Sequence, residues 1–163
     1  MIKHKILYHA SPIGGLTTLN PANETPRFVG EDNYVFATPY KAVAAMFLAP
    51  RNLNTEISKY NDKFVIFINA SQEKYRELDK GGSIYEVDGT HFKTDTSIGM
   101  GETEWVSDHS LEPLSEEVFD SSLNAMKSNE VEIYFVDDRT FRNVRNDPPN
   151  ALNLVSISSK LVH

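Results

Sequence analysis

Residues 64–68 read Phe64-Val65-Ile66-Phe67-Ile68 and form the most apolar run in the chain. Five consecutive β-branched and aromatic residues are typical of a strand that is buried on both faces, so the run predicts the central strand of a sheet. A polar stretch, 51–62, precedes it. After it, Ser71 is expected to cap a short helix that ends at Leu78, before the Gly81-Gly82 turn.

Working outward from this run, strands dominate the predicted order, with few helices between them. The strands are predicted at 5–8, 34–37, 83–87, 102–107 and 131–136, with a last edge strand at 152–157. Further helices are predicted at 39–48, where Thr38-Pro39 is a start signal, and at 115–127, where Glu116-Glu117 suits a first turn. Because the strands do not alternate with crossover helices, the fold class is α+β rather than a doubly wound sheet.

The composition is that of one soluble domain spanning residues 1–163. Hydrophobic residues make up 40% of the chain and charged residues 24%, which argues against wholesale disorder. With 16 basic and 23 acidic side chains, the formal net charge of −7 disfavours extended binding of nucleic acid. A local pocket for a dinucleotide is compatible with this charge, because backbone N–H groups can hold a pyrophosphate.

Several kinds of binding site and enzyme are disfavoured, because the sequence lacks their usual motifs. The chain has no cysteine, which excludes disulfides, thiolate zinc sites and cysteine nucleophiles. Its five histidines are scattered without metal-ligand spacing, so no metal site is predicted. The glycine motifs of Rossmann dehydrogenases, P-loop NTPases and α/β-hydrolases are missing. No apolar run reaches the length of a membrane helix and the start is too short for a signal peptide, so we expect a cytoplasmic protein.

Three short fragments contain residues that could bind a ligand or take part in catalysis. His9 follows the first predicted strand, so its ring could stand at a sheet end and donate a hydrogen bond in a cleft, or be a buried structural histidine. Tyr34 and Tyr40 flank a strand-to-helix junction and could offer an aromatic face to a ligand, whereas Val35 and Phe47 there are explained by core packing.

The third fragment contains Glu102 and Glu104, which lie two residues apart. On a strand this spacing directs both carboxylates to one face and sends Trp105 to the other, into the core. Paired carboxylates can stabilise a developing positive charge and deprotonate a nucleophile. An exposed acidic strand face is the alternative in a chain this rich in carboxylates.

Taken in order, Leu7-Tyr8-His9-Ala10-Ser11, then Val35-Phe36-Ala37-Thr38 with 42–47, then Glu102-Thr103-Glu104-Trp105-Val106 resemble the signature of the ADP-ribosyltransferase superfamily. The likeness is to its small bacterial rifamycin-modifying branch and to its poly(ADP-ribose)-polymerase-like branch. The matched pieces lie between residues 5 and 107, and their order and spacing carry the resemblance.

The resemblance implies a split pair of small, strongly bent sheets with two or three flanking helices and an NAD cleft between the sheets. It places His9 and Ala10 on a ribose of NAD, and Tyr34 or Tyr40 against the nicotinamide ring. The family often has glycine where Ala10 stands, and polymerase-like members have tyrosine where Val35 stands.

By the same resemblance, Glu104 is the catalytic carboxylate and Glu102 completes a Glu-x-Glu pair like that of arginine-modifying members. The expected function is that of a bacterial or phage-like NAD-dependent ADP-ribosyltransferase, a glycosyltransferase that cleaves the nicotinamide–ribose bond. NAD is its substrate, and the acceptor of ADP-ribose is a protein side chain, a small molecule or a nucleic-acid end.

Three alternatives stay open. The chain could be a non-catalytic module on the same fold that binds a nucleotide or an ADP-ribosylated group. It could be a protein-interaction domain whose acidic surface meets a basic partner. An RNA 2′-phosphotransferase is an enzymatic rival, made less attractive by the few arginines upstream of the expected cleft.

Overall fold

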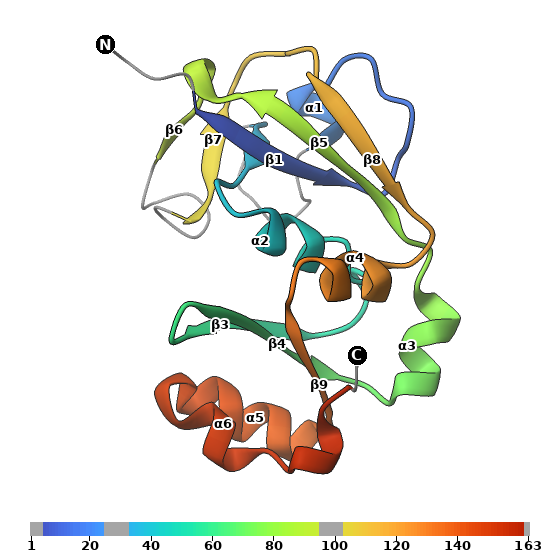
Figure 1. Ribbon diagram of the computed structural model, residues 1–163, viewed down its shortest axis with the longest axis vertical. Coiled ribbons are helices and arrows are strands. Elements are labelled where there is room, and N and C mark those ends of the chain that lie inside the picture. Colours follow the sequence, from blue (N-terminus) through green and yellow to red (C-terminus); the bar gives the residue numbers. More distant parts are fainter. Residues whose placement is uncertain (1–4, 25–32, 95–102, 162–163) are drawn as a thin grey trace.

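The apolar run forms the middle strand of a three-stranded sheet in the computed structural model, which describes residues 5–24, 33–94 and 103–161 (Figure 1). This strand, β4 (Lys63–Asn69), pairs antiparallel with β3 (Thr55–Tyr60) and parallel with β9 (Glu132–Val136). Its four central side chains are buried, as a strand covered on both faces requires. We call this the lower sheet.

Two further sheets lie across the molecule from it and are joined to each other. One has the order β1-β5-β8 and the other the order β2-β7-β6, and all of their pairings are antiparallel. Tyr8 and Thr38 form a bridge between them, with N–H···O distances of 2.8 and 2.9 Å. We call the joined pair the upper sheets. Their strands are β1 (Ile6–Ser11), β2 (Val35–Ala37), β5 (Gly82–Asp88), β6 (Lys93–Thr94), β7 (Trp105–Ser107) and β8 (Ser115–Phe119).

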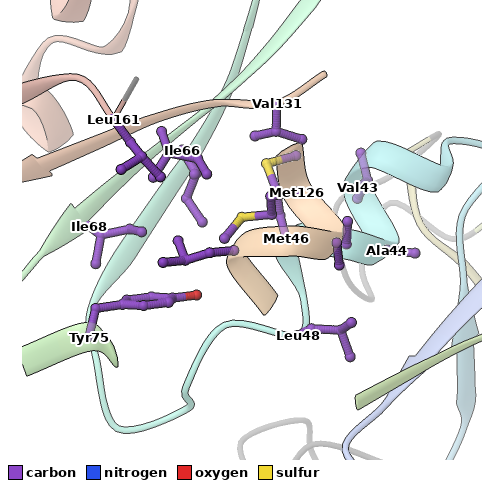
Figure 2. Close-up of a cluster of buried hydrophobic side chains, with 14 of the residues drawn as sticks. Val43, Ala44, Met46, Leu48, Ile66, Ile68, Tyr75, Met126, Val131 and Leu161 are labelled. Carbon is purple, nitrogen blue, oxygen red and sulfur yellow. The ribbon is translucent and has the colours of Figure 1, made fainter. Parts of the chain in front are cut away.

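Helices fill the space between the sheets and cover the far face of the lower one (Figure 1). The helices α2 (Lys41–Met46) and α4 (Ser122–Ser128) lie in between, where Met46 and Met126 join Ile66 and Ile84 in the main core cluster (Figure 2). On the far face, α5 (Asp138–Asn146) and α6 (Ala151–Leu154) pack on β4 through a separate apolar cluster. The order from top to bottom is therefore sheet, helices, sheet, helices.

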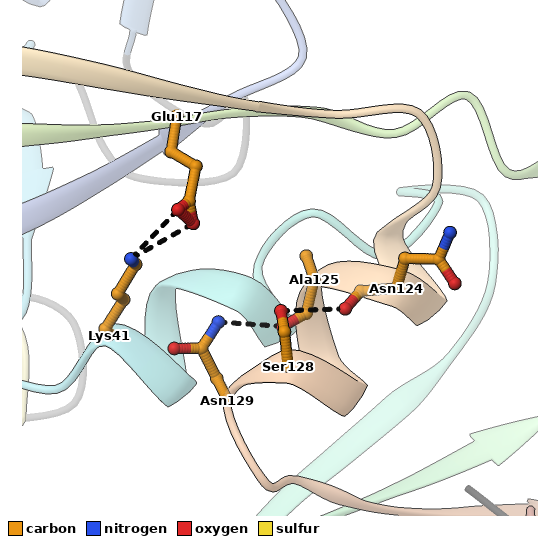
Figure 3. A network of polar contacts seen from close by, with 6 residues as sticks. All are labelled: Lys41, Glu117, Asn124, Ala125, Ser128 and Asn129. Atoms are coloured by element: carbon orange, nitrogen blue, oxygen red, sulfur yellow. Dashed lines mark hydrogen bonds and ion pairs between the residues drawn. The ribbon is translucent and has the colours of Figure 1, made fainter.

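Polar contacts fix the helices between the sheets. Lys41 Nζ on α2 lies 3.1 and 3.2 Å from the two carboxylate oxygens of Glu117 on β8 (Figure 3). Asp79, which ends α3 (Gln72–Leu78), accepts hydrogen bonds from Ser122 N–H at 2.8 Å and Ser121 Oγ at 2.9 Å. These groups lie at the start of α4, so the carboxylate caps that helix and ties it to α3.

Several predicted elements are confirmed. β9 lies where the 131–136 pattern predicted a strand, and α3 ends at Leu78 as expected. Ser71 Oγ accepts from Lys74 N–H at 3.1 Å, which is the expected cap. The α+β class is confirmed, and the described residues contain six α-helical segments rather than two or three; the remaining one is α1 (Pro21–Glu24), and 3₁₀ turns occur at Gly89–His91, Pro148–Asn150 and Ile157–Ser159.

The helix predicted over 115–127 is wrong in its first part. Residues 115–119 are the strand β8, and the helix α4 starts at Ser122. Glu116 and Glu117 do not form a helical first turn but point to opposite faces of the sheet, because pairing with β5 overrides the local preference.

Other predicted element boundaries also differ from those in the structure. The edge strand predicted at 152–157 is wrong, since residues 151–154 form α6. The helix predicted from Pro39 begins at Lys41, because Thr38 is held in the bridge to Tyr8 and its Oγ1 accepts from Tyr40 N–H at 3.1 Å. β1 continues to Ser11, so His9 lies within the strand rather than beyond its end.

In the part of the chain that the structure describes, no helix is both long and apolar enough to cross a membrane.

Candidate functional site

The three sequence fragments that carry the candidate residues become neighbouring strands. In the β2–β7 pair, Ala37 lies opposite Trp105; Thr38 follows Ala37, and Glu104 precedes Trp105. Thr38 in turn bridges to Tyr8 of β1, the residue before His9. We call this arrangement the β1–β2–β7 row.

His9 is held at the point where the two upper sheets part. Its side chain is 2% exposed, and its Nδ1 lies 2.6 Å from the carbonyl oxygen of Phe36. The next ladder bond after the Tyr8–Thr38 bridge would come to this carbonyl from the N–H of Ala10. The imidazole makes that bond instead. Because a carbonyl only accepts, Nδ1 carries a proton and donates it to this bond.

Ala10 and His9 leave β1 on opposite faces, as strand alternation requires. The methyl group of Ala10 packs against the main core cluster. The ring of His9 instead lies beside Tyr85 of β5, with centroids 6.3 Å apart. Of the two residues expected to face a ribose, His9 therefore lies on the same face of the sheet as Tyr85, and Ala10 lies on the opposite face.

Glu104 precedes β7 and is 8% exposed, which is unusual for a carboxylate. Trp105 packs against the second apolar cluster, where Leu7 and Tyr85 also lie, as its predicted place in the core requires. Strand alternation then points Glu104 away from that cluster, to the face of Phe36. Glu102 lies outside the described residues.

The two candidate tyrosines go to different places. Tyr34 is half-buried, and its ring meets that of Phe36 edge-on at 6.3 Å, so it stays on the face to which alternation assigns Glu104. Tyr40 is 41% exposed and its ring lies 5.3 Å from that of Phe64 on β4. Lys59 Nζ stands 5.2 Å from the Tyr40 ring centroid. Tyr40 thus contacts the lower sheet, and Tyr34 belongs to the β1–β2–β7 row.

A polar cluster that the sequence did not predict holds the turn after β1. Glu116 Oε1 accepts from Gly15 N–H at 2.8 Å and Ser83 Oγ at 2.7 Å, and lies 3.3 Å from the hydroxyl of Tyr85. The hydrogen bond from Gly15, followed by that from Ser83, lowers the pKa of Glu116. We call Gly15, Ser83, Tyr85 and Glu116 the Glu116 latch.

Tyr85 connects this latch to His9. Its hydroxyl donates to the carbonyl oxygen of Ile13 at 2.7 Å and accepts from Leu16 N–H at 3.1 Å. Burial raises the pKa of Tyr85, so it stays a neutral donor at physiological pH. The turn that follows His9 is therefore fastened at both ends by groups on β5 and β8. No sequence signal identified Glu116, because its segment was predicted to be helical.

Grooves lie elsewhere on the surface. The larger, of about 670 Å³, runs between the β3–β4 turn and α6 and is lined by Tyr60, Pro148 and Leu152 among others. A second, of about 260 Å³, lies between the end of α2 and Gly81. His9, Tyr34, Tyr40 and Glu104 line neither groove. Across residues 5–24, 33–94 and 103–161, no three acidic or histidine side chains gather closely enough to hold a metal ion.

Comparison with known proteins adds no relative. No protein-family model matches the chain, and no match was found among curated proteins or solved structures.

Proposed function

We propose that this chain is an NAD-dependent ADP-ribosyltransferase whose sheets are the split, bent pair typical of that family. The observation that supports the proposal is the β1–β2–β7 row, in which three fragments far apart in sequence become neighbours. Those fragments are the ones whose residues resemble the family signature. Nothing in the spacing of the sequence alone required them to meet.

In this proposal Glu104 stabilises the transition state. When the bond between nicotinamide and ribose C1′ breaks, its electron pair leaves with the pyridine nitrogen and C1′ gains positive charge. A carboxylate that is 8% exposed acts on that charge more strongly than one in water, because the surroundings screen it less. The acceptor then attacks C1′ and loses its proton to a base, the role expected of Glu102.

The roles of the other residues follow from their contacts. His9, whose Nδ1 donates to the Phe36 carbonyl, would contact a ribose of NAD. Tyr34 supplies the aromatic face for nicotinamide, since Tyr40 contacts the lower sheet. Ala10 would contribute its backbone, because its methyl group packs into the core.

The test is release of free nicotinamide from NAD by the purified protein. Glu104→Gln keeps the size of the side chain and removes its charge, and we expect it to slow release by about 100-fold or more. Glu112→Gln, an exposed carboxylate on the loop before β8, is the matched control and should leave the rate unchanged. Absence of release by the wild type, or equal release by the Glu104 variant, would overturn the assignment.

A non-catalytic binding module is the second candidate, and one observation favours it. His9 and Glu104 are both largely buried, and alternation directs them to different faces of the upper sheets. The enzyme requires both to act on one bound NAD, whereas a binding module does not. Calorimetry with NAD and with ADP-ribose separates the two functions. Saturable binding without release of nicotinamide supports the binding module, and turnover rules it out.

A further inference from the structure

The strand β8 is the outermost strand of the upper sheets. It pairs with β5 on one side, and no described strand pairs with its other side. Figure 1 shows it at one side of the upper sheets, with the loop that follows β1 passing beyond it in this view. Residues 114–118 are all exposed, so the described part of the chain leaves their side chains open to solvent. The outward N–H and C=O groups of β8 are therefore a template for another strand.

Exposed apolar side chains flank this edge. Val118 is 67% exposed and shares one face of β8 with Glu116, and Leu114, immediately before the strand, is 58% exposed. Ile13, also exposed, stands on the same face, because the Glu116 latch fastens its turn there. A strand that only faced water would carry polar residues at these positions.

The charged side chains along this edge of β8 are all acidic. The segment 111–120 contains four acidic residues and no basic one: Glu112, Glu116, Glu117 and Asp120. Lys41 pairs with Glu117, so one of the four charges is offset. The others are exposed, and the hydrogen bonds to Glu116 keep it ionised to lower pH than a free glutamate.

Another outer strand, β3 of the lower sheet, differs in each of these respects. β3 carries Lys59 near its end, and the remaining side chains of that strand are half-buried. Lysine on an edge strand is a common defence against pairing with another chain. β8 carries neither lysine nor proline.

We propose that the outer edge of β8 binds an extended basic segment of a partner protein, which joins the upper sheets as an added strand. Backbone hydrogen bonds along β8 supply the pairing. Apolar side chains of the partner cover Leu114 and Val118, and its lysines or arginines meet the carboxylates of 111–120. This surface is independent of the proposed enzymatic activity.

Two labelled peptides test the proposal, one alternating lysine with valine and the other alternating glutamate with valine. We expect the lysine peptide to bind and the glutamate peptide not to bind, with affinity falling as salt is raised to about 0.5 M. Amide exchange should slow along 114–119 when the lysine peptide is bound. Equal binding of both peptides, or slowed exchange elsewhere but not in β8, overturns the proposal.

Surface substitutions test whether peptide binding is specific to the edge of β8. Val118→Lys places a repelling charge on the edge and should weaken binding of the lysine peptide about tenfold, while Val118→Glu should not weaken it. Ile157→Lys makes the same change at an exposed apolar site far along the chain and should have no effect. An equal loss in the Ile157 variant would mean non-specific attraction and contradict the proposal. Self-association of the protein that Val118→Lys abolishes would assign the edge to a second copy instead.

Discussion

At the scale of single residues, His9 stabilises the junction between the upper sheets. Its imidazole replaces a backbone donor to the Phe36 carbonyl at the parting of the upper sheets. We expect His9→Ala to lower the free energy of unfolding by about 2–4 kcal/mol, because a buried carbonyl loses its donor and a cavity opens. Urea unfolding measures the change.

Two further variants identify the cause of that loss. His9→Gln can still direct an N–H to the carbonyl and should recover part of the stability. His109→Ala removes an exposed ring and should cost little. Equal losses in the Ala and Gln variants would show that packing of the ring, rather than the hydrogen bond, stabilises the junction.

The Glu116 latch gives a residue-level prediction on pH. The pKa of Glu116 is lowered in the folded protein, chiefly by the N–H of Gly15, so its contribution to stability is present above the ordinary glutamate pKa. It is lost as the pH falls through the folded value. The amide resonance of Gly15 should therefore shift with a midpoint below about 4.3. In Glu116→Gln this shift should disappear; a shift that persisted would mean that another group titrates there.

At the scale of elements, the Gly81-Gly82 turn between α3 and β5 admits no side chain. Gly81 has φ +67°, and a Cβ there would stand 2.1 Å from the carbonyl oxygen of Phe119. Gly15 has a similar φ of +72° but nothing within 4 Å. We expect Gly15→Ala to cost about 1 kcal/mol, the price of the backbone conformation alone. Gly81→Ala should cost clearly more, as measured by thermal unfolding of both variants; equal costs would contradict the steric argument.

Elements with a strong local pattern were predictable, and those fixed by distant partners were not. β4 and β9 are apolar runs, and Ser71 is a recognisable cap, so each was correctly predicted. β3 was missed because its side chains are half-buried on both faces, which leaves no clean alternation. The sequence did contain one signal for this hairpin, because Asn61 and Asp62 are residue types that favour a two-residue hairpin turn. In the structure both residues have positive φ, as such a turn requires.

The candidate site shows the same division. The sequence pointed to His9, Tyr34 and Glu104 as candidates by their place in three fragments, and those fragments do become adjacent strands. It could not show that the Phe36 carbonyl holds His9, or that Tyr40 turns toward Phe64, because both contacts depend on tertiary packing. Glu116 was hidden for a related reason, since two adjacent glutamates suit a helix start as well as an edge strand.

At the scale of the whole molecule, carboxylates that join separate elements should make the protein sensitive to acid. For Asp79 and Glu132, burial acts to raise the pKa, but hydrogen bonds outweigh it and leave both values lowered. Asp79 joins α3 to α4, and Glu132 on β9 meets Lys63 and Lys160, each at 3.2 Å. With folded pKa values below the unfolded ones, stability is present at neutral pH and is lost as pH falls below about 4.

The midpoint of urea unfolding should therefore drop between neutral and acidic pH. Asp79→Asn should lower stability at neutral pH and flatten this dependence, whereas Asp62→Asn, on an exposed turn, should leave it unchanged. An identical pH profile in the Asp79 variant would mean that the cap to α4 contributes nothing to acid sensitivity.

The parallel pairing of β4 with β9 also bears on how the chain reaches its native state. Residues 63–69 leave the ribosome long before residues 132–136, so the apolar run lacks its second neighbouring strand until residues 70–131 have been made. Long loop closure of this kind slows folding and leaves an aggregation-prone segment uncovered in the meantime. Nascent chains that stop short of β9 should consequently engage chaperones that bind apolar extended segments, and complete ones should release them.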